Sequence, residues 1–175
     1  MEEKNVRLKD GRTVVLRLLR SEDKQRLLGM FATMSENALL WSNPPYDEQK
    51  IDRWMSGSES GLSIVAQSED GLVGISAIYQ FPKPRQRGVS EMMIYIQQDF
   101  QGVGLGSEMT DVLIILAKGR GIHRIGLEVV EDNKSAVGLY KKFGFEIEGV
   151  MKDAYFGADE KYHNLLVMGI VFPEN

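Results

Sequence analysis

The sequence predicts a mixed α/β (α+β) fold, in which a mostly antiparallel central sheet of about seven strands is flanked by about four helices. Two observations support this fold class. Short apolar runs rich in β-branched residues recur along the chain, and turn residues such as glycine, proline and aspartate bound them. Other segments place apolar residues at every third or fourth position, as an amphipathic helix does. The 175 residues contain neither repeats nor linkers, so a single domain is expected over residues 1–175.

The first 70 residues are expected to form a hairpin followed by two helices. Two short runs of β-forming residues flank Asp10-Gly11, a dipeptide that favours hairpin turns. Ser21 is expected to cap the first helix, and Asp47 is expected to cap a second, shorter one. Pro44-Pro45 keeps the segment between these helices out of regular structure.

The rest of the chain is expected to hold further strands and two more helices. A proline-containing basic segment, residues 82–88, cannot pair regularly and is expected to form an exposed loop. Asp132 or Asn133 can cap the last helix, and Gly144 can end it. Strands are expected at residues 63–67, 72–81, 90–96, 125–129, 145–147 and 165–172, and helices at residues 105–116 and 133–143.

A glycine-rich stretch, Gln101–Gly106, joins a predicted strand to a predicted helix. The first turn of a helix leaves backbone N–H groups without partners, and the helix dipole adds partial positive charge there. Because glycines let another molecule approach the backbone closely, this turn is suited to binding phosphate. The dinucleotide fingerprint G-x-G-x-x-G and the Walker loop are both absent from it. A tight turn without a ligand is the alternative that the glycines alone leave open.

Two segments resemble motifs of the GNAT (Gcn5-related) N-acetyltransferases. Gln101–Gly106 is similar to the coenzyme A loop of that family, R/Q-x-x-G-x-G/A, and Asn133–Phe145 is similar to its N-x-x-A-x-x-x-Y-x-x-x-G-F segment. The resemblance covers residues 72–172 well and the first 70 residues loosely. Residues 151–156 and the final strand resemble the branch that acetylates ribosomal proteins and polyamines. These cues do not choose an acceptor.

The resemblance implies an acetyl-CoA-dependent N-acetyltransferase whose fourth and fifth strands splay apart to admit the cofactor. The glycine turn would bind the diphosphate, the strand at residues 94–96 would pair with the pantetheine arm, and Asn133 would hydrogen-bond that arm. Trp41 and Tyr46 are candidates for the wall of the acceptor site, with packing under a loop as the alternative for both. The expected cofactor-binding residues are Ile94, Tyr95, Ile96, Gln101, Gly102, Val103, Gly104, Leu105, Gly106, Asn133 and Tyr140.

Tyr140 and Glu91 are the expected catalytic residues. The phenol of Tyr140 can donate a proton to the departing thiolate, and its position matches the helix tyrosine of the family. Glu91 can accept the proton of the amine, directly or through water, and resembles a strand glutamate of the family. A packed tyrosine and a solvent-facing glutamate are the structural alternatives. His123 and His163 are weaker candidates for the base.

Composition narrows the classes of function. A net charge of −4 gives no basic surface for nucleic acid, and two separated histidines without any cysteine give no metal signal. Without a cysteine nucleophile, we expect the amine to attack the acetyl group directly in a ternary complex. The sequence has no signal peptide and no run of membrane-spanning length, so a cytoplasmic protein without membrane contact is expected.

The acceptor is expected to be a primary amine, carried by a protein N-terminus, a lysine, a polyamine, an amino acid or another small molecule. The alternative function is a non-catalytic module that binds acyl-CoA for regulation. The presence of Tyr140 favours the enzyme, because a module that only binds acyl-CoA needs no proton donor. The sequence leaves a homodimer open.

Overall fold

The chain forms one eight-stranded sheet with helices on both faces. The computed structural model describes residues 1–57, 62–81 and 83–173, so Pro82, the first residue of the expected basic loop, lies outside the described residues. The strands are β1 (Lys4–Arg7), β2 (Thr13–Leu18), β3 (Leu62–Ser68), β4 (Gly71–Gln80), β5 (Val89–Ile96), β6 (Arg124–Val130), β7 (Glu146–Phe156) and β8 (Tyr162–Val171). The helices are α1 (Lys24–Ala32), α2 (Glu36–Leu39), α3 (Glu48–Gly57), α4 (Leu105–Gly119) and α5 (Lys134–Lys142), with 3-10 turns η1 (Ser21–Asp23), η2 (Pro84–Gln86) and η3 (Gln98–Phe100).

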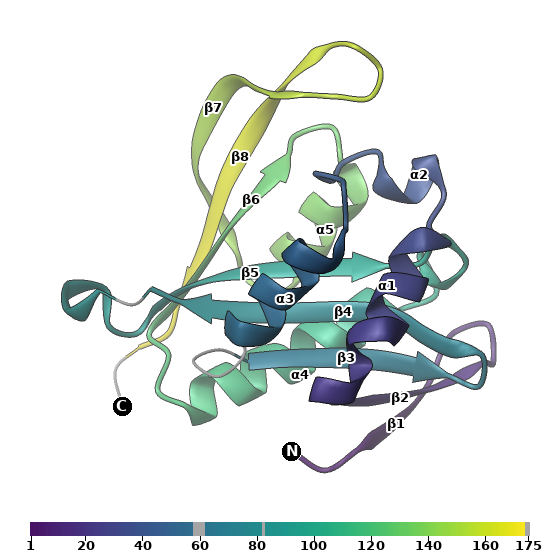
Figure 1. Ribbon diagram of the computed structural model, residues 1–175. Helices are drawn as coiled ribbons and strands as arrows, with labels where there is room; N and C mark the ends of the chain where they lie inside the picture. Colours follow the sequence, from purple (N-terminus) through teal and green to yellow (C-terminus); the bar gives the residue numbers. More distant parts are fainter. Residues whose placement is uncertain (58–61, 82, 174–175) are drawn as a thin grey trace.

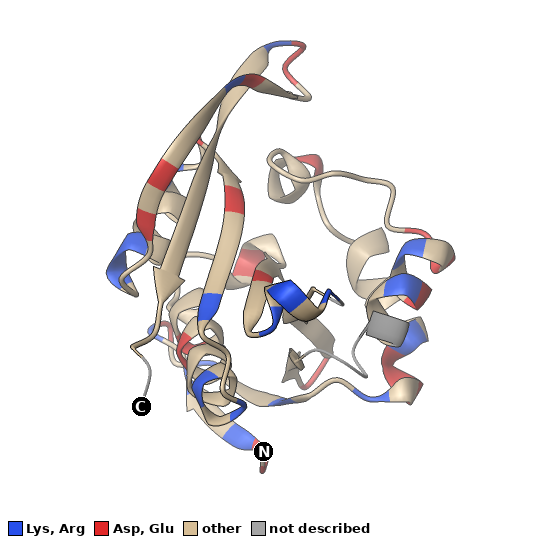
Figure 2. Ribbon diagram, turned by 90° about the vertical axis from the view of Figure 1, so that its left-hand side faces the viewer, with Lys and Arg blue, Asp and Glu red and all other residues tan. Residues whose placement is uncertain are grey.

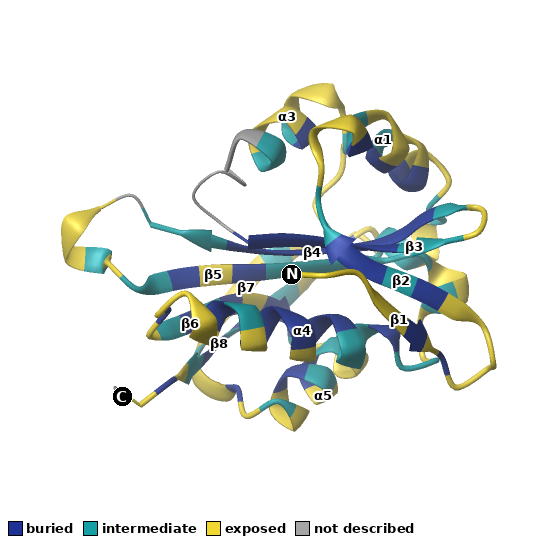
Figure 3. Cartoon of the chain, turned by 90° about the horizontal axis from the view of Figure 1, so that it is seen from below, coloured by how far each residue is buried: buried dark blue, intermediate teal, exposed yellow. Residues whose placement is uncertain are grey.

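The sheet has the order β1-β2-β3-β4-β5-β6-β8-β7. Every neighbouring pair is antiparallel except β5 and β6. Helices α1 and α3 cover one face, and α4 and α5 cover the other (Figures 1 and 3). The predicted fold class is therefore confirmed: the eight strands correspond to the runs expected along the chain, and α2 is an additional short helix among the described elements. None of the helices in the described ranges is both long and apolar enough to cross a membrane.

The core is divided between the two faces of the sheet. The larger cluster packs α4 and α5 against the strands through residues such as Leu105, Met109 and Leu113, all fully buried. The smaller cluster packs α1 and α3 against β3 and β4. Successive strand residues point to opposite faces, so Met92 belongs to the larger cluster and Met93 packs against the smaller one. Strand β5 therefore contacts both layers.

Helices α1 and α3 are joined by ion pairs as well as by apolar packing. Basic and acidic segments lie side by side on these two helices (Figure 2). Lys24 of α1 lies 3.3 Å from Glu48 and 2.8 Å from Asp52, both on α3. Such exposed pairs contribute little individually, so the apolar cluster beneath them is the main stabilising contact.

Strands β5 and β6 separate after a short paired segment. They pair only from Val89 to Glu91 on β5, with Arg124 to Gly126 on β6 as partners. Beyond that point β6 turns away together with β7 and β8, which form an arm extending from the sheet (Figure 1). The expected splay is present, but it lies between the fifth and sixth strands in chain order, because the N-terminal hairpin contributes two strands.

The predicted helix caps are correct at two of three starts. The Asp47 carboxylate accepts from the Lys50 N–H at 2.9 Å, and the Asn133 side chain caps α5. Ser21 does not cap the first helix, which begins with the 3-10 turn η1. Asp23 takes the capping role instead. Its buried carboxylate binds the Arg17 guanidinium at 2.7 and 2.8 Å and accepts the backbone N–H of Arg20 at 2.9 Å.

Candidate active site

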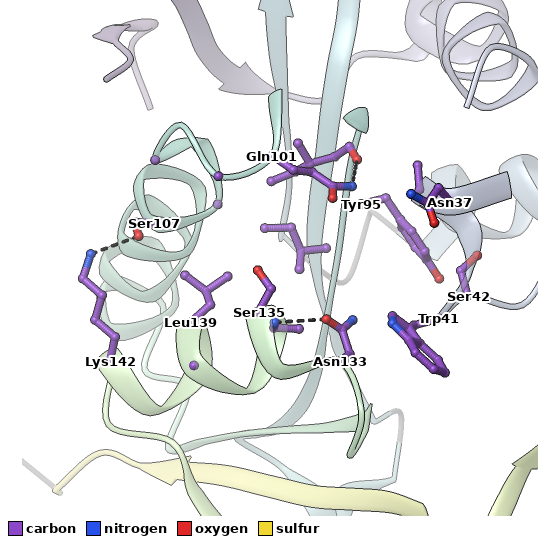
Figure 4. A pocket seen from close by; sticks show the side chains of 18 of the residues that line it. Asn37, Trp41, Ser42, Tyr95, Gln101, Ser107, Asn133, Ser135, Leu139 and Lys142 are labelled. Atoms are coloured by element: carbon purple, nitrogen blue, oxygen red, sulfur yellow. Dashed lines mark hydrogen bonds between the residues drawn. The ribbon is translucent and has the colours of Figure 1, made fainter. Parts of the chain in front are cut away.

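A groove of about 460 Å³ opens where β5 and β6 separate. The start of α4 lies at one end, α5 forms a side, and α2 lies at the other end (Figure 4). It is lined by Lys9, Met34, Asn37, Ala38, Trp41, Ser42, Ile94, Tyr95, Ile96, Gln101, Gly102, Gly104, Gly106, Ser107, Asn133, Ser135, Ala136, Gly138, Leu139 and Lys142. The groove thus combines the glycine turn, the free edge of β5 and one side of α5.

The glycine turn presents an unpartnered row of backbone donors. Gly102 and Gly104 have φ values of 73° and 98°, a conformation that favours glycine, and Gly104 is the N-cap of α4. Within the part of the chain that the structure describes, the backbone N–H groups from Val103 to Ser107 have no protein acceptor. Because α4 is a 15-residue helix, its dipole adds partial positive charge at this end. The turn can therefore bind an anion.

Gly106 keeps the groove open beside the turn. A Cβ atom at this position would lie 3.3 Å from Leu139 Cδ2 and 3.5 Å from Ile96 Cδ1. Helix α4 therefore approaches both α5 and β5 closely at Gly106, and a side chain there would displace Leu139 or fill the groove.

On the edge of β5 that faces the groove, the backbone groups of Ile94 and the Ile96 N–H have no partner among the described residues. The Gln97 N–H donates to Val73 on β4, so the alternate residues Ile94 and Ile96 direct their backbone groups toward β6. The side-chain amide of Gln101 donates to the Ile96 carbonyl at 2.9 Å, which agrees with this direction. An extended ligand can therefore pair with this edge as an additional strand.

Asn133 joins the start of α5 to the groove. Its side-chain oxygen accepts from the Ala136 N–H at 3.1 Å and so caps the helix. The amide nitrogen points away from the cap, toward Trp41 (Figure 4). Asn133 thus has a structural role through its oxygen and retains a donor for a ligand through its nitrogen.

The structure brings most of the expected cofactor-binding residues to this groove. Three of them do not line it with their side chains: Val103, Leu105 and Tyr140. Leu105 is fully buried in the core and Val103 packs against it, so both can contribute only backbone groups at the turn. The residues that do line it are Ile94, Tyr95, Ile96, Gln101, Gly102, Gly104, Gly106 and Asn133.

Tyr140 lies behind the groove in the core. Its side chain is 6% exposed, and its ring lies 5.6 Å from that of Phe145. Burial raises the pKa of Tyr140, so the phenol keeps its proton at neutral pH. Tyr95, at the β5 edge, also has a pKa raised by burial, with smaller contributions from Tyr46 and Tyr140.

Glu91 lies at the last paired position of β5 before the strands separate. It is exposed, it pairs with Tyr79 on the neighbouring strand β4, and it does not line the groove. Because strand residues alternate, it shares a face with Met93 and Tyr95, on the α1 and α3 side of the sheet. Glu91 and the α5 helix that carries Tyr140 are therefore on opposite faces of the sheet, at the opening between β5 and β6.

The two aromatic candidates for the acceptor wall have different positions. Trp41 lines the end of the groove near α2. Tyr46 stacks on Phe31 at a centroid distance of 4.2 Å and also contacts Trp54, so it packs in the smaller core cluster. The loop that contains Trp41 is tied to the arm, because the Tyr155 hydroxyl lies 2.9 Å from the Ser42 carbonyl oxygen.

His163 connects the arm to the start of α5. Its Nδ1 lies 2.8 Å from Asp132 and its Nε2 lies 2.9 Å from Asp159, while Trp41 contacts the ring edge-on at 5.0 Å. The hydrogen bonds with Asp159 and then Asp132 raise the pKa of His163. An imidazolium donating to two carboxylates is suited to holding these segments together and is poorly suited to accepting a proton. His123 is exposed on the loop before β6.

Six polar residues that line the groove were not among the expected site residues: Lys9, Asn37, Ser42, Ser107, Ser135 and Lys142. Lys142 Nζ donates to Ser107 Oγ at 3.0 Å and so links the end of α5 to the start of α4. A signal for Lys142 exists, since Ser135, Leu139 and Lys142 follow the i, i+4, i+7 spacing of one helix side. The sequence around Lys9 does not indicate its position, because its side chain lies against Gly104, which is distant in the sequence.

Comparison with known proteins gives consistent matches. Residues 25–145 match the acetyltransferase (GNAT) family. The chain is 31% identical over 116 residues to the L-methionine sulfoximine/L-methionine sulfone acetyltransferase of Pseudomonas paraeruginosa, a match that covers 64% of this chain and 67% of that protein. A ribosomal-protein-alanine N-acetyltransferase structure from Brucella melitensis has a TM-score of 0.78 at 24% identity, over 90% of this chain and 99% of that chain. The structure of yncA from Salmonella typhimurium with its cofactor acetyl-CoA has a TM-score of 0.77 at 19% identity, over 93% and 95% of the two chains.

Replacing His163 by Gln is expected to remove a pH-dependent contribution to stability. Because the folded-state pKa is raised above the ordinary value of 6.5, this contribution is complete below that pH and is lost as the pH rises through the folded value. Urea unfolding of both proteins between pH 5.5 and 9 measures it, and the difference in unfolding free energy should shrink toward alkaline pH. His123→Gln is the control, and a His163 difference that stays constant with pH contradicts the prediction.

Proposed function

Because the chain belongs to the acetyltransferase (GNAT) family and is therefore an acyltransferase, we propose that it transfers an acetyl group from acetyl-CoA to the primary amine of an amino acid or a similar small amine. The observation that carries this proposal is the unpartnered row of N–H groups from Val103 to Ser107 at the head of the groove. A buried or ligand-facing donor row without acceptors is costly, and an anionic ligand would satisfy it.

The parts of the groove fit acetyl-CoA in order. The N–H row would hold the diphosphate, the free edge of β5 at Ile94 and Ile96 would pair with the amides of the pantetheine arm, and the Asn133 amide nitrogen would donate to that arm. The relation to yncA, whose structure contains acetyl-CoA, supports this choice of donor. Acetyl-CoA supplies the acetyl group as a thioester.

Tyr140 is proposed to hold the proton that the departing sulfur requires. Its buried phenol stays protonated at neutral pH because burial raises its pKa. Its helix, α5, lines the groove through residues such as Leu139, while the Tyr140 ring packs behind it in the larger core cluster. A phenol buried behind the groove would donate its hydrogen to the departing sulfur without competition from bulk water.

Glu91 is proposed to accept the proton of the acceptor amine. Its carboxylate is exposed at the point where β5 and β6 part, so it can be reached through water from the groove. The chain has no cysteine, which leaves no thiol to carry the acetyl group, and direct transfer to the amine is proposed. A purely solvent-facing role for Glu91 is the alternative.

A small acceptor is supported by the end of the groove near α2. Asn37, Trp41 and Ser42 line this end, and the Tyr155 hydroxyl fixes the loop at Ser42. A loop held in this way leaves a bounded space with polar groups, which suits an amino acid better than a folded protein surface. The relative from Pseudomonas paraeruginosa is named for L-methionine sulfoximine and L-methionine sulfone, two amino acids, which supports a small acceptor of this class.

An acceptor screen tests the proposed function. The purified protein is mixed with acetyl-CoA and a panel of amines that includes amino acids, methionine sulfoximine, polyamines and peptides, and free thiol is measured. Thiol release that depends on an amino acid is the expected result. Coenzyme A binding without acceptor-dependent release would support the non-catalytic module, and release with peptides alone would contradict the small-acceptor class.

Tyr140→Phe is expected to lower turnover by roughly 10-fold to 1000-fold with little change in acetyl-CoA affinity, because a general acid is lost and the shape is kept. Steady-state kinetics and calorimetric titration measure the two quantities. Tyr162→Phe is the matched control, since Tyr162 is 67% exposed on the arm. Unchanged turnover in Tyr140→Phe would assign the proton to another group.

Gly104→Asp is expected to weaken acetyl-CoA binding by more than roughly tenfold, because a carboxylate would repel the diphosphate and oppose the helix dipole. Gly104→Asn separates charge from strain, since asparagine has a similar shape and tolerates the left-handed conformation at this φ of 98°. Titration with acetyl-CoA should rank wild type, Asn and Asp in decreasing affinity. Equal affinity of the Asn and Asp variants would argue against an anion at this turn.

A further inference from the structure

The N-terminal hairpin β1–β2 is fixed onto the glycine turn, although about 90 residues separate them in the sequence. The Lys9 N–H donates to the Val103 carbonyl at 3.0 Å. The Arg12 guanidinium lies 3.9 Å from the centroid of the Phe100 ring and donates to the Asp99 carbonyl. The hairpin therefore contacts η3 and the turn itself, immediately before α4.

The side chain of Lys9 runs along the turn. A Cβ atom at Gly104 would lie 3.7 Å from both Cγ and Cε of Lys9, and Lys9 lines the groove. The other cations of the hairpin that contact this region are engaged: Lys4 pairs with Glu108 at 3.1 Å, and Arg12 pairs with Asp10 at 2.6 Å. Within the described residues, the Lys9 ammonium has neither a carboxylate nor a carbonyl partner.

The charges around the groove are one-sided. Two lysines, Lys9 and Lys142, line it, and none of the described lining residues is acidic. The whole chain has 25 acidic and 21 basic residues, so the chain is acidic on balance whereas the groove lining is basic. An ammonium group next to the positive end of α4 is electrostatically unfavourable unless an anion lies between them.

We propose that Lys9 is a cofactor-binding residue, whose ammonium pairs with the diphosphate of acetyl-CoA from the hairpin side of the glycine turn. The inference rests on the proposed function. The diphosphate is favoured over the 3′-phosphate because the Lys9 stem lies against Gly104, near the start of the N–H row, whereas Lys142 contacts Ser107 at its other end. The hairpin thereby completes a site whose other parts all lie after residue 33.

Lys9→Gln, Lys9→Arg and Lys4→Gln test this inference by calorimetric titration with acetyl-CoA. Lys9→Gln should bind roughly tenfold more weakly, the effect of losing one charge-assisted contact, and Lys9→Arg should restore most of the affinity. Lys4→Gln removes the same charge from the same hairpin at a residue that does not line the groove, and it should bind as wild type does. Thermal unfolding of the free proteins checks that the variants fold equally well.

Two shortened ligands identify the phosphate. With 3′-dephospho-CoA, the ratio of the dissociation constants of Lys9→Gln and wild type should be unchanged, and with acetyl-pantetheine, which lacks all phosphates, it should fall to about one. A ratio that already disappears with 3′-dephospho-CoA would overturn the diphosphate assignment. Wild-type affinity of Lys9→Gln for acetyl-CoA would overturn the inference but leave the proposed function intact. Absence of coenzyme A binding by wild type would instead overturn the proposed function.

Discussion

The separation of β5 from β6 is the constraint on which the rest of the site depends. These strands form the one parallel pair in the described sheet, and they pair over only three residues on each side. A parallel pair needs a crossover connection, and here that crossover is η3, the glycine turn and α4. The same crossover therefore delivers the start of α4 next to the unpaired edge of β5. An unpaired strand edge and an unpaired helix end therefore line the same groove, where both offer backbone hydrogen-bonding groups to a ligand.

The separation also organises the proposed proton-handling residues. Glu91 is the last residue of β5 that pairs with β6, so it is exposed at the opening. Tyr140 comes from the helix that fills the space below the gap, so it is buried. Burial keeps the phenol protonated, and exposure leaves the carboxylate in contact with water. The opposite roles proposed for the two side chains follow from their opposite environments.

The elements that carry the site could be predicted from the sequence because their signals are local. The turn at Gly104 needs a left-handed residue, the α5 cap needs a short polar side chain such as Asn133, and both are visible within a few positions. The predicted strand at 145–147 was too short, since β7 continues to Phe156 with mostly exposed residues and therefore shows no alternation. The predicted cap at Ser21 is wrong because capping preferences do not show that Arg17 binds Asp23 in the core. The position of Lys9 is not predictable from the sequence because it depends on a contact between the N-terminal hairpin and the glycine turn, which are distant in the sequence.

Segments that are distant in the sequence lie at both ends of the groove: the N-terminal hairpin at the glycine turn, and the α2 loop at the other end. The glycine turn and α5 are near in sequence and form the part of the groove proposed for the donor. The end proposed for the acceptor instead contains Trp41, whose loop contacts the arm through Tyr155 and His163. Segments with few local constraints can change without disturbing the turn, since their contacts with it are few. If the groove binds acetyl-CoA as proposed, changes in the α2 loop and the β7–β8 arm would alter the acceptor while the glycine turn keeps the donor, so the motifs alone do not determine the acceptor class.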